Sequence, residues 1–107
     1  MTDNIVILST CATAEDAERI ARALLEERVA ACVNVLPGMR SFYRWQGKLE
    51  DASEWLLVIK SSRSLFGALR ATLEKAHPYD VPEIIALPII DGAPGYLQWL
   101  QDSLRLQ

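Results

Sequence analysis

The stretch that decides the fold is HPYDVPEIIALPII, residues 77–90. It opens where a helix must stop, because Pro78 fixes φ and removes a backbone donor. The stretch holds three of the five prolines of the chain, and each proline favours extended geometry in the residue before it. We therefore expect a stiff, extended connection over residues 78–83 that leads into an apolar strand over residues 83–90. The connection would hold four side chains in fixed directions: His77, Tyr79, Asp80 and Glu83.

The composition indicates one acidic globular domain. The chain has 107 residues, of which 50% are apolar, and this is enough for a single domain with a real core. The net charge is −3 and the basic residues are scattered, which argues against nucleic acid and anionic membranes as partners. No apolar run approaches the roughly 20 residues needed to cross a bilayer, and the N-terminus lacks a secretory signal. We expect one cytoplasmic domain over residues 1–107.

Before the deciding stretch, the sequence predicts a strand, a helix and a long hairpin. Residues 4–9 form a short run rich in β-branched side chains, which is typical of a buried strand. Residues 17–25 repeat apolar side chains at helical spacing. Two extended segments, residues 31–45 and 49–60, flank Gln46–Gly47, a pair suited to a tight turn.

The order of the predicted elements indicates an α+β fold. A second apolar helical stripe covers residues 65–76, and a short helix follows Pro94. Strand, helix, strand, strand, helix, strand is the ferredoxin-like βαββαβ arrangement, here with a C-terminal helix. Right-handed crossovers place the first and third strands in the centre of the sheet. Pro37 and Pro88 then fall in the two outer strands, where a missing N–H is tolerated. Pro37–Gly38 favours either a turn or a bulge.

The far part of the predicted hairpin is aromatic. Residues 41–45 read SFYRW, and the arm is longer than a lone sheet of this size requires. An exposed aromatic arm beside open sheet edges is a liability, and further copies of the chain in a closed ring would cover it. We therefore expect four residues at a trimer interface: Phe42, Tyr43, Trp45 and Trp99. The alternative is that Tyr43 and Trp45 lie back on their own core.

Five segments, taken in order and spacing, carry a family resemblance over nearly the whole chain. They are LLEERVAACVNVLPG (24–38), SFYRWQGKLE (41–50), VIKSS (58–62), HPYDVPEIIALPI (77–89) and YLQWL (96–100). In these segments the chain resembles the CutA family of divalent-cation tolerance proteins. The resemblance implies a homotrimer of ferredoxin-like subunits, PII-like in architecture, whose hairpins clasp their neighbours. It also implies tolerance to copper and other divalent metals, copper binding in some members, and no enzymatic activity.

The metal site that the resemblance implies is only partly present in this sequence. The family pattern uses a cysteine at the end of the first strand and a His-His pair before Pro-Tyr. Here these positions hold Ser9 and Ala76–His77, and Ser9 and Ala76 offer a soft metal ion no ligand. Cys11 follows two residues later, and whether it replaces the missing thiol stays open. We expect a weaker site, for copper or another divalent cation, built from His77, Cys11 and Glu83.

The expected ligand cleft lies between subunits, where the 77–83 connection would meet a neighbour's hairpin. Its further candidate residues are Lys60, Tyr79 and Trp45, and its ligand would be a divalent metal ion or a small anionic molecule. Each candidate has a structural alternative. His77 can cap a helix end, Glu83 can be a solvated carboxylate, and the aromatic side chains can serve subunit packing alone.

Two functions remain open from the sequence. The first is a trimeric metal-tolerance protein, and the second is a PII-like signalling or scaffold trimer for which metal is incidental. An enzyme is not expected, because no Ser–His–Asp arrangement or Gly-rich phosphate loop accompanies His77, and a fold alone implies no activity.

Overall fold

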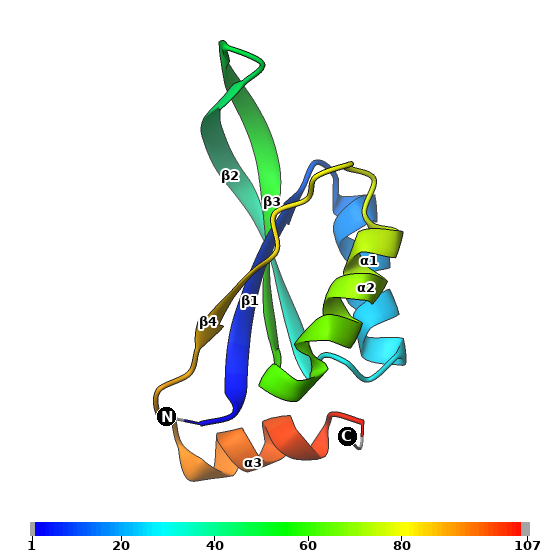
Figure 1. The fold of residues 1–107 in the computed structure, drawn as a ribbon, viewed down its shortest axis with the longest axis vertical. Helices are drawn as coiled ribbons and strands as arrows, with labels where there is room; N and C mark the ends of the chain where they lie inside the picture. The colour runs from blue at the N-terminus through cyan, green and yellow to red at the C-terminus, as the bar shows by residue number, and fades with distance from the viewer. Residues whose placement is uncertain (1, 106–107) are drawn as a thin grey trace.

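Four strands form one antiparallel sheet in the order β2-β3-β1-β4 in the computed structural model, which describes residues 2–105. The elements are β1 (Asn4–Cys11), α1 (Ala14–Glu26), β2 (Cys32–Trp45), β3 (Lys48–Ser62), a 3-10 turn (Arg63–Leu65), α2 (Phe66–Ala76), β4 (Ile85–Pro88) and α3 (Pro94–Asp102). This confirms the predicted ferredoxin-like α+β arrangement with its C-terminal helix (Figure 1). None of the helices within residues 2–105 is long and apolar enough to cross a membrane.

The two outer strands carry the prolines, as predicted. Pro88 ends β4 and Pro37 lies within β2, so neither removes a hydrogen bond from the centre of the sheet. The pairing of β2 with β3 shifts between Leu36 and Met39, and Gly38 has a φ of 79°. Pro37–Gly38 therefore forms a bulge, which bends the strand without ending it.

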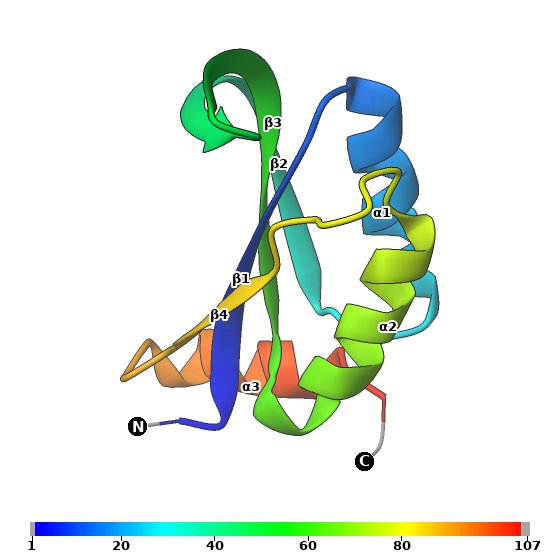
Figure 2. The same ribbon diagram turned by 45° about the horizontal axis from the view of Figure 1, so that its top comes forward.

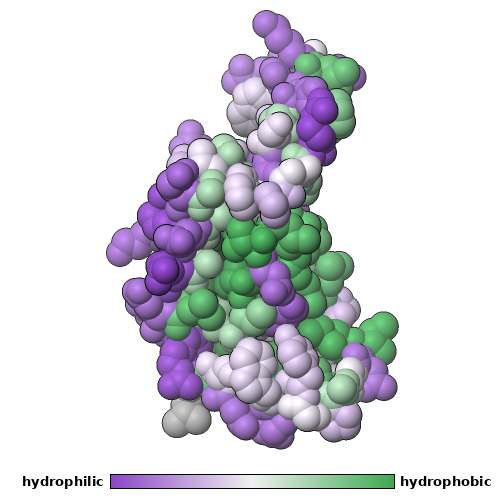
Figure 3. All heavy atoms as spheres, turned by 180° about the vertical axis from the view of Figure 1, so that it is seen from behind, coloured by the Kyte–Doolittle hydropathy of each residue, from purple (hydrophilic) through white to green (hydrophobic). Residues whose placement is uncertain are grey.

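Helices α1 and α2 lie side by side on one face of the sheet, and α3 lies at the end opposite the hairpin (Figures 1 and 2). The core between the sheet and α1/α2 is fully buried at Ile7, Leu57 and Ile59 on the strands. Because side chains alternate across a strand, the neighbours of these residues along each strand point to the opposite face of the sheet. No helix within residues 2–105 covers the middle of that face. Seen from behind, apolar side chains gather in the middle of the molecule (Figure 3).

The β2–β3 hairpin projects far beyond the rest of the domain (Figure 1). Gln46 and Gly47 have φ values of 50° and 78°, the conformation that tight hairpin turns require. On the arm, Phe42, Tyr43 and Trp45 are 65%, 44% and 55% exposed. The aromatic side chains therefore do not fold back into the core of their own chain.

The connection after α2 differs from the expectation. Residues 78–81 form bends, and only residues 82–84 of the connection lack a bend before β4 begins. The backbone N–H of Tyr79 donates to Nδ1 of His77 at 3.1 Å, which stabilises a bend at this point. The prediction of an extended connection was wrong for this part, and β4 begins at Ile85 instead of residue 83.

Candidate functional site

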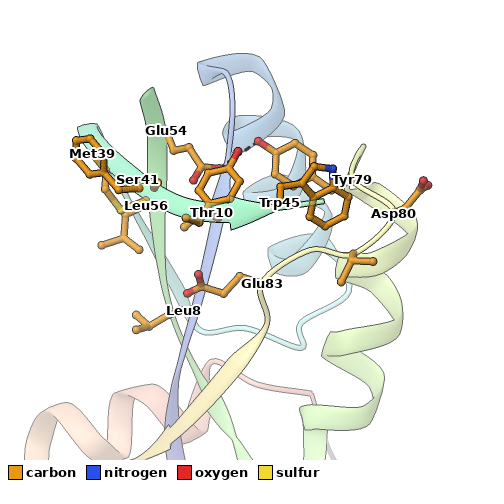
Figure 4. Close-up of a pocket in the computed structure, with 13 residues that line it drawn as sticks. Leu8, Thr10, Met39, Ser41, Trp45, Glu54, Leu56, Tyr79, Asp80 and Glu83 are labelled. Carbon is orange, nitrogen blue, oxygen red and sulfur yellow. Dashed lines mark hydrogen bonds between the residues drawn. The ribbon is translucent and has the colours of Figure 1, made fainter. Parts of the chain in front are cut away.

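A pocket of about 850 Å³ lies at the base of the hairpin, on the sheet face that α1 and α2 do not cover (Figure 4). Strands β1, β2 and β3 form its floor and one wall, and the connection between α2 and β4 forms the other wall. Its lining combines aromatic, apolar and acidic side chains. They are Leu8, Thr10, Met39, Ser41, Phe42, Tyr43, Trp45, Glu54, Leu56, Tyr79, Asp80, Val81 and Glu83.

Tyr79 ties the connection to the hairpin. Its hydroxyl donates to Oε2 of Glu54 on β3 at 3.1 Å, and Figure 4 shows Trp45 beside its ring. Desolvation and the hydrogen bond to Glu54 together raise the pKa of Tyr79 to about 12, because both disfavour the phenolate. The tyrosine is therefore a neutral donor at physiological pH.

Two carboxylates share the pocket. Partial desolvation, followed by the negative charge of Glu54, raises the pKa of Glu83 above its ordinary value. Figure 4 shows the Glu83 carboxylate turned over Leu8, and Asp80, which also lines the pocket, has its carboxylate turned away from that of Glu83. Among the described residues that line the pocket, none is basic. The electrostatics of the site therefore favour a positively charged ligand.

His77 is placed by the end of α2 and is 7% exposed. Its Nε2 lies 2.7 Å from the carbonyl oxygen of Thr10, and its Nδ1 accepts from the N–H of Tyr79. Because a carbonyl only accepts and Nδ1 already accepts from an N–H, Nε2 is the ring nitrogen that donates. Both ring nitrogens are thus engaged, and a metal ion could bind His77 only by displacing one of these bonds.

The predicted metal-ligand residues do not form a site within one chain. Cys11 is fully buried, its Sγ lies 3.6 Å from the carbonyl oxygen of Thr13, and burial raises the pKa of its thiol. The thiolate that a copper ion requires is therefore disfavoured. Within residues 2–105, no group of three or more His, Cys, Asp or Glu side chains is arranged to hold a metal ion. The set His77, Cys11 and Glu83 does not fit copper in this geometry.

Some of the other predicted residues line the pocket, and the rest lie outside it. Tyr79 and Trp45 line the pocket together, with Phe42 and Tyr43. The structure does not bring Lys60 to it, because Lys60 lies toward the α3 end of β3 and donates to Oδ1 of Asn34. Trp99 lies on α3, where its ring centroid is 5.6 Å from that of Tyr96.

Among the charged residues that line the pocket, Glu54 is the one that was not predicted from the sequence. It lies on β3, two and four residues before Leu56 and Val58, so strand alternation places all three on one face. The sequence signal for Glu54 was a carboxylate on the same strand face as two apolar side chains. The sequence did not show how the 78–83 connection folds, and this fold brings Tyr79 and Glu83 close to Glu54.

Ser9 stands where the family pattern has a cysteine, and substitutions of Ser9 test how this difference affects the stability of the fold. Its side chain is fully buried, and its hydroxyl has no hydrogen-bond partner among residues 2–105. A buried hydroxyl without a partner costs about 1–3 kcal/mol, whereas a thiol behaves as a small apolar group. We expect Ser9→Cys to raise the free energy of unfolding by about 1 kcal/mol. Urea unfolding measures it, and Ser9→Ala separates loss of the hydroxyl from filling of the space. A less stable Ser9→Cys variant would contradict this account.

The raised pKa of Glu83 predicts a specific pH dependence. A carboxyl group whose pKa is raised on folding stabilises the fold while it is protonated, below its ordinary pKa of 4.5. That contribution is lost as the pH rises through the raised pKa. Relative to Glu83→Gln, the wild type should therefore lose stability as the pH rises from below 4.5 to 7. Unfolding at several pH values measures this, and NMR titration of Glu83 in Glu54→Gln should give a lower pKa. A wild type that gains stability over the same range would contradict it.

Comparison with known proteins gives a consistent result. The family model described as "CutA1 divalent ion tolerance protein" matches residues 5–103. "Divalent-cation tolerance protein CutA" of Thermus thermophilus is 48% identical over 92% of this chain and 95% of its own length. The protein of the same name from Pectobacterium atrosepticum is 50% identical, over 96% of this chain and 94% of its own length. The crystal structure of CutA from Xylella fastidiosa is 43% identical, with a TM-score of 0.94 over 97% of this chain and 100% of that chain.

Proposed function

This chain belongs to the CutA1 divalent ion tolerance protein family, and we propose that it acts in the cytoplasm as a homotrimer that responds to divalent cations. The proposal places cation binding in the clefts between subunits. Each cleft would combine the pocket at the base of one hairpin with the surface of a neighbouring copy.

The observation that carries this proposal is the pair Glu54 and Glu83 in one pocket without a basic lining residue. Divalent cations accept carboxylate oxygens as ligands. Two carboxylates are too few to hold such an ion firmly, so a neighbouring subunit must complete the donor set. The proposal does not use His77 and Cys11 as ligands, because both ring nitrogens of His77 are engaged and the Cys11 side chain is fully buried.

The assembly is supported by surfaces that one chain leaves uncovered. The arm exposes three aromatic side chains, and Ile85 and Leu87 on β4 are 50% and 47% exposed. Exposed apolar surface beside an open sheet edge favours association between copies. A closed ring would cover both edges at once.

Light scattering and calorimetry test the proposal together. We expect a trimer at micromolar concentration that binds zinc or copper ions, and an affinity about tenfold lower in Glu83→Gln, because ligand charge tunes cation affinity. Glu18→Gln is the matched control, since that exposed carboxylate lies on α1, outside the residues that line the pocket. A monomer would overturn the assembly, and equal titrations of wild type and Glu83→Gln would overturn the cation site.

A second candidate is a scaffold trimer that binds a small ligand, with metal incidental. One observation favours it, namely that within residues 2–105 no group of three metal-binding side chains forms. If a chelator leaves the partners of the trimer in a native lysate unchanged, the scaffold is favoured. If the chelator releases them, the metal-dependent function is favoured.

A further inference from the structure

The walls of the pocket at the base of the hairpin are unusually rich in aromatic rings. Tyr43 and Trp45 on β2 and Tyr79 on the facing connection all line it. They remain partly exposed in a single chain, at 44%, 55% and 37%, so a ligand reaches their faces wherever a neighbouring copy leaves them open. Aromatic faces attract cations through the ring quadrupole, and tryptophan and tyrosine do so most strongly.

The charges in the pocket have one sign. Glu54 and Glu83 face the same space, and the described lining contains no lysine, arginine or histidine. An anionic ligand would meet these carboxylates without a compensating charge. This geometry disfavours the small anionic molecule that was considered from the sequence.

The size and floor of the pocket distinguish between kinds of cation. A volume of about 850 Å³ suits a small organic molecule and far exceeds the space that a single metal ion fills. Leu8, Leu56 and Val81 contribute apolar surface, which would pack against methyl or methylene groups. A bare metal ion gains nothing from such surface, and it needs more oxygen donors than one chain supplies.

We propose that this pocket binds a small organic cation of the quaternary ammonium class, held against Tyr43, Trp45 and Tyr79 and neutralised by Glu54 and Glu83. The hydrogen bond from Tyr79 to Glu54 fixes one aromatic wall relative to one carboxylate. The inference rests on the second candidate function, and it requires that a neighbouring subunit walls the pocket without filling it.

Calorimetry with two probes of equal shape tests the charge requirement. Choline carries a trimethylammonium group, and 3,3-dimethylbutan-1-ol places a neutral tert-butyl group in the same position. We expect choline to bind the assembled protein and the alcohol to bind at least about tenfold more weakly, because only the charged probe gains from aromatic faces. Equal binding of the two would overturn the inference, since the pocket would then recognise only apolar shape.

Variants locate the binding within the pocket. Trp45→Leu and Glu83→Gln should each weaken choline binding by about tenfold. Glu18→Gln and Trp99→Leu should leave it unchanged, because the first side chain lies on α1 and the second on α3, both outside the residues that line the pocket. Circular dichroism and light scattering on every variant exclude misfolding as the cause. If the outside variants weaken binding as much as the pocket variants, the assignment is overturned.

The outcomes separate this inference from the proposed function. A trimer that binds zinc but not choline would overturn the organic-cation site and leave the metal function standing. A monomer that binds choline with the expected dependence on Trp45 would support the site and remove the proposed assembly. A trimer that binds neither probe would indicate that a neighbour fills the pocket, which overturns the inference.

Discussion

Replacing His77 with alanine is expected to lower the free energy of unfolding by about 3 kcal/mol. The imidazole joins the end of α2 to the end of β1 through Thr10, and it holds the bend that follows through Tyr79. Alanine removes both bonds and opens a cavity where the buried ring now lies. Each of these changes lowers the free energy of unfolding.

Urea unfolding measures this loss, with Lys75→Ala as the control from the same helical turn. Lys75 is exposed, so its removal should change stability by less than about 0.5 kcal/mol. Titration of His77→Ala with copper and zinc ions then separates structure from ligand binding. A variant as stable as the wild type that no longer binds these ions would show that His77 is a ligand and contradict the structural role.

The order of the strands could be predicted from the sequence, because the prolines and the apolar patterns are independent signals and both lead to the same order. Pro37 and Pro88 had to lie in outer strands, and the crossover rule placed the second and fourth strands there. The observed order β2-β3-β1-β4 confirms both arguments. The choice between turn and bulge at Pro37–Gly38 needed the structure, because both conformations use the same residues.

The site was harder to predict for a physical reason. Alternation tells which face of a strand a side chain occupies, but it does not tell which loop lies over that face. Glu54 and Lys60 both point to the uncovered face of β3, and only Glu54 lies under the connection that follows α2. That connection bends because the N–H of Tyr79 binds the His77 ring, a contact between neighbours that proline rules do not describe.

The uncovered sheet face also carries the strongest test of the proposed trimer. Val58 lies near its centre, directly between Leu8 on β1 and Asn34 on β2. It is only partly buried in one chain, whereas Leu57 and Ile59 on either side are fully buried beneath the helices. A charge at Val58 is thus tolerated by a single subunit, which can leave it in water, but not by an interface that covers it.

We expect Val58→Glu to convert the trimer to a folded monomer at micromolar concentration, because an unpaired charge buried in an interface costs several kcal/mol. Light scattering measures the mass, and circular dichroism checks that the subunit remains folded. Thermal unfolding should occur at lower temperature, since association stabilises the folded form by mass action. Ala71→Glu, which adds the same charge on the exposed side of α2, should remain a trimer. If Val58→Glu keeps the mass and stability of the wild type, this face is not the one through which the copies associate.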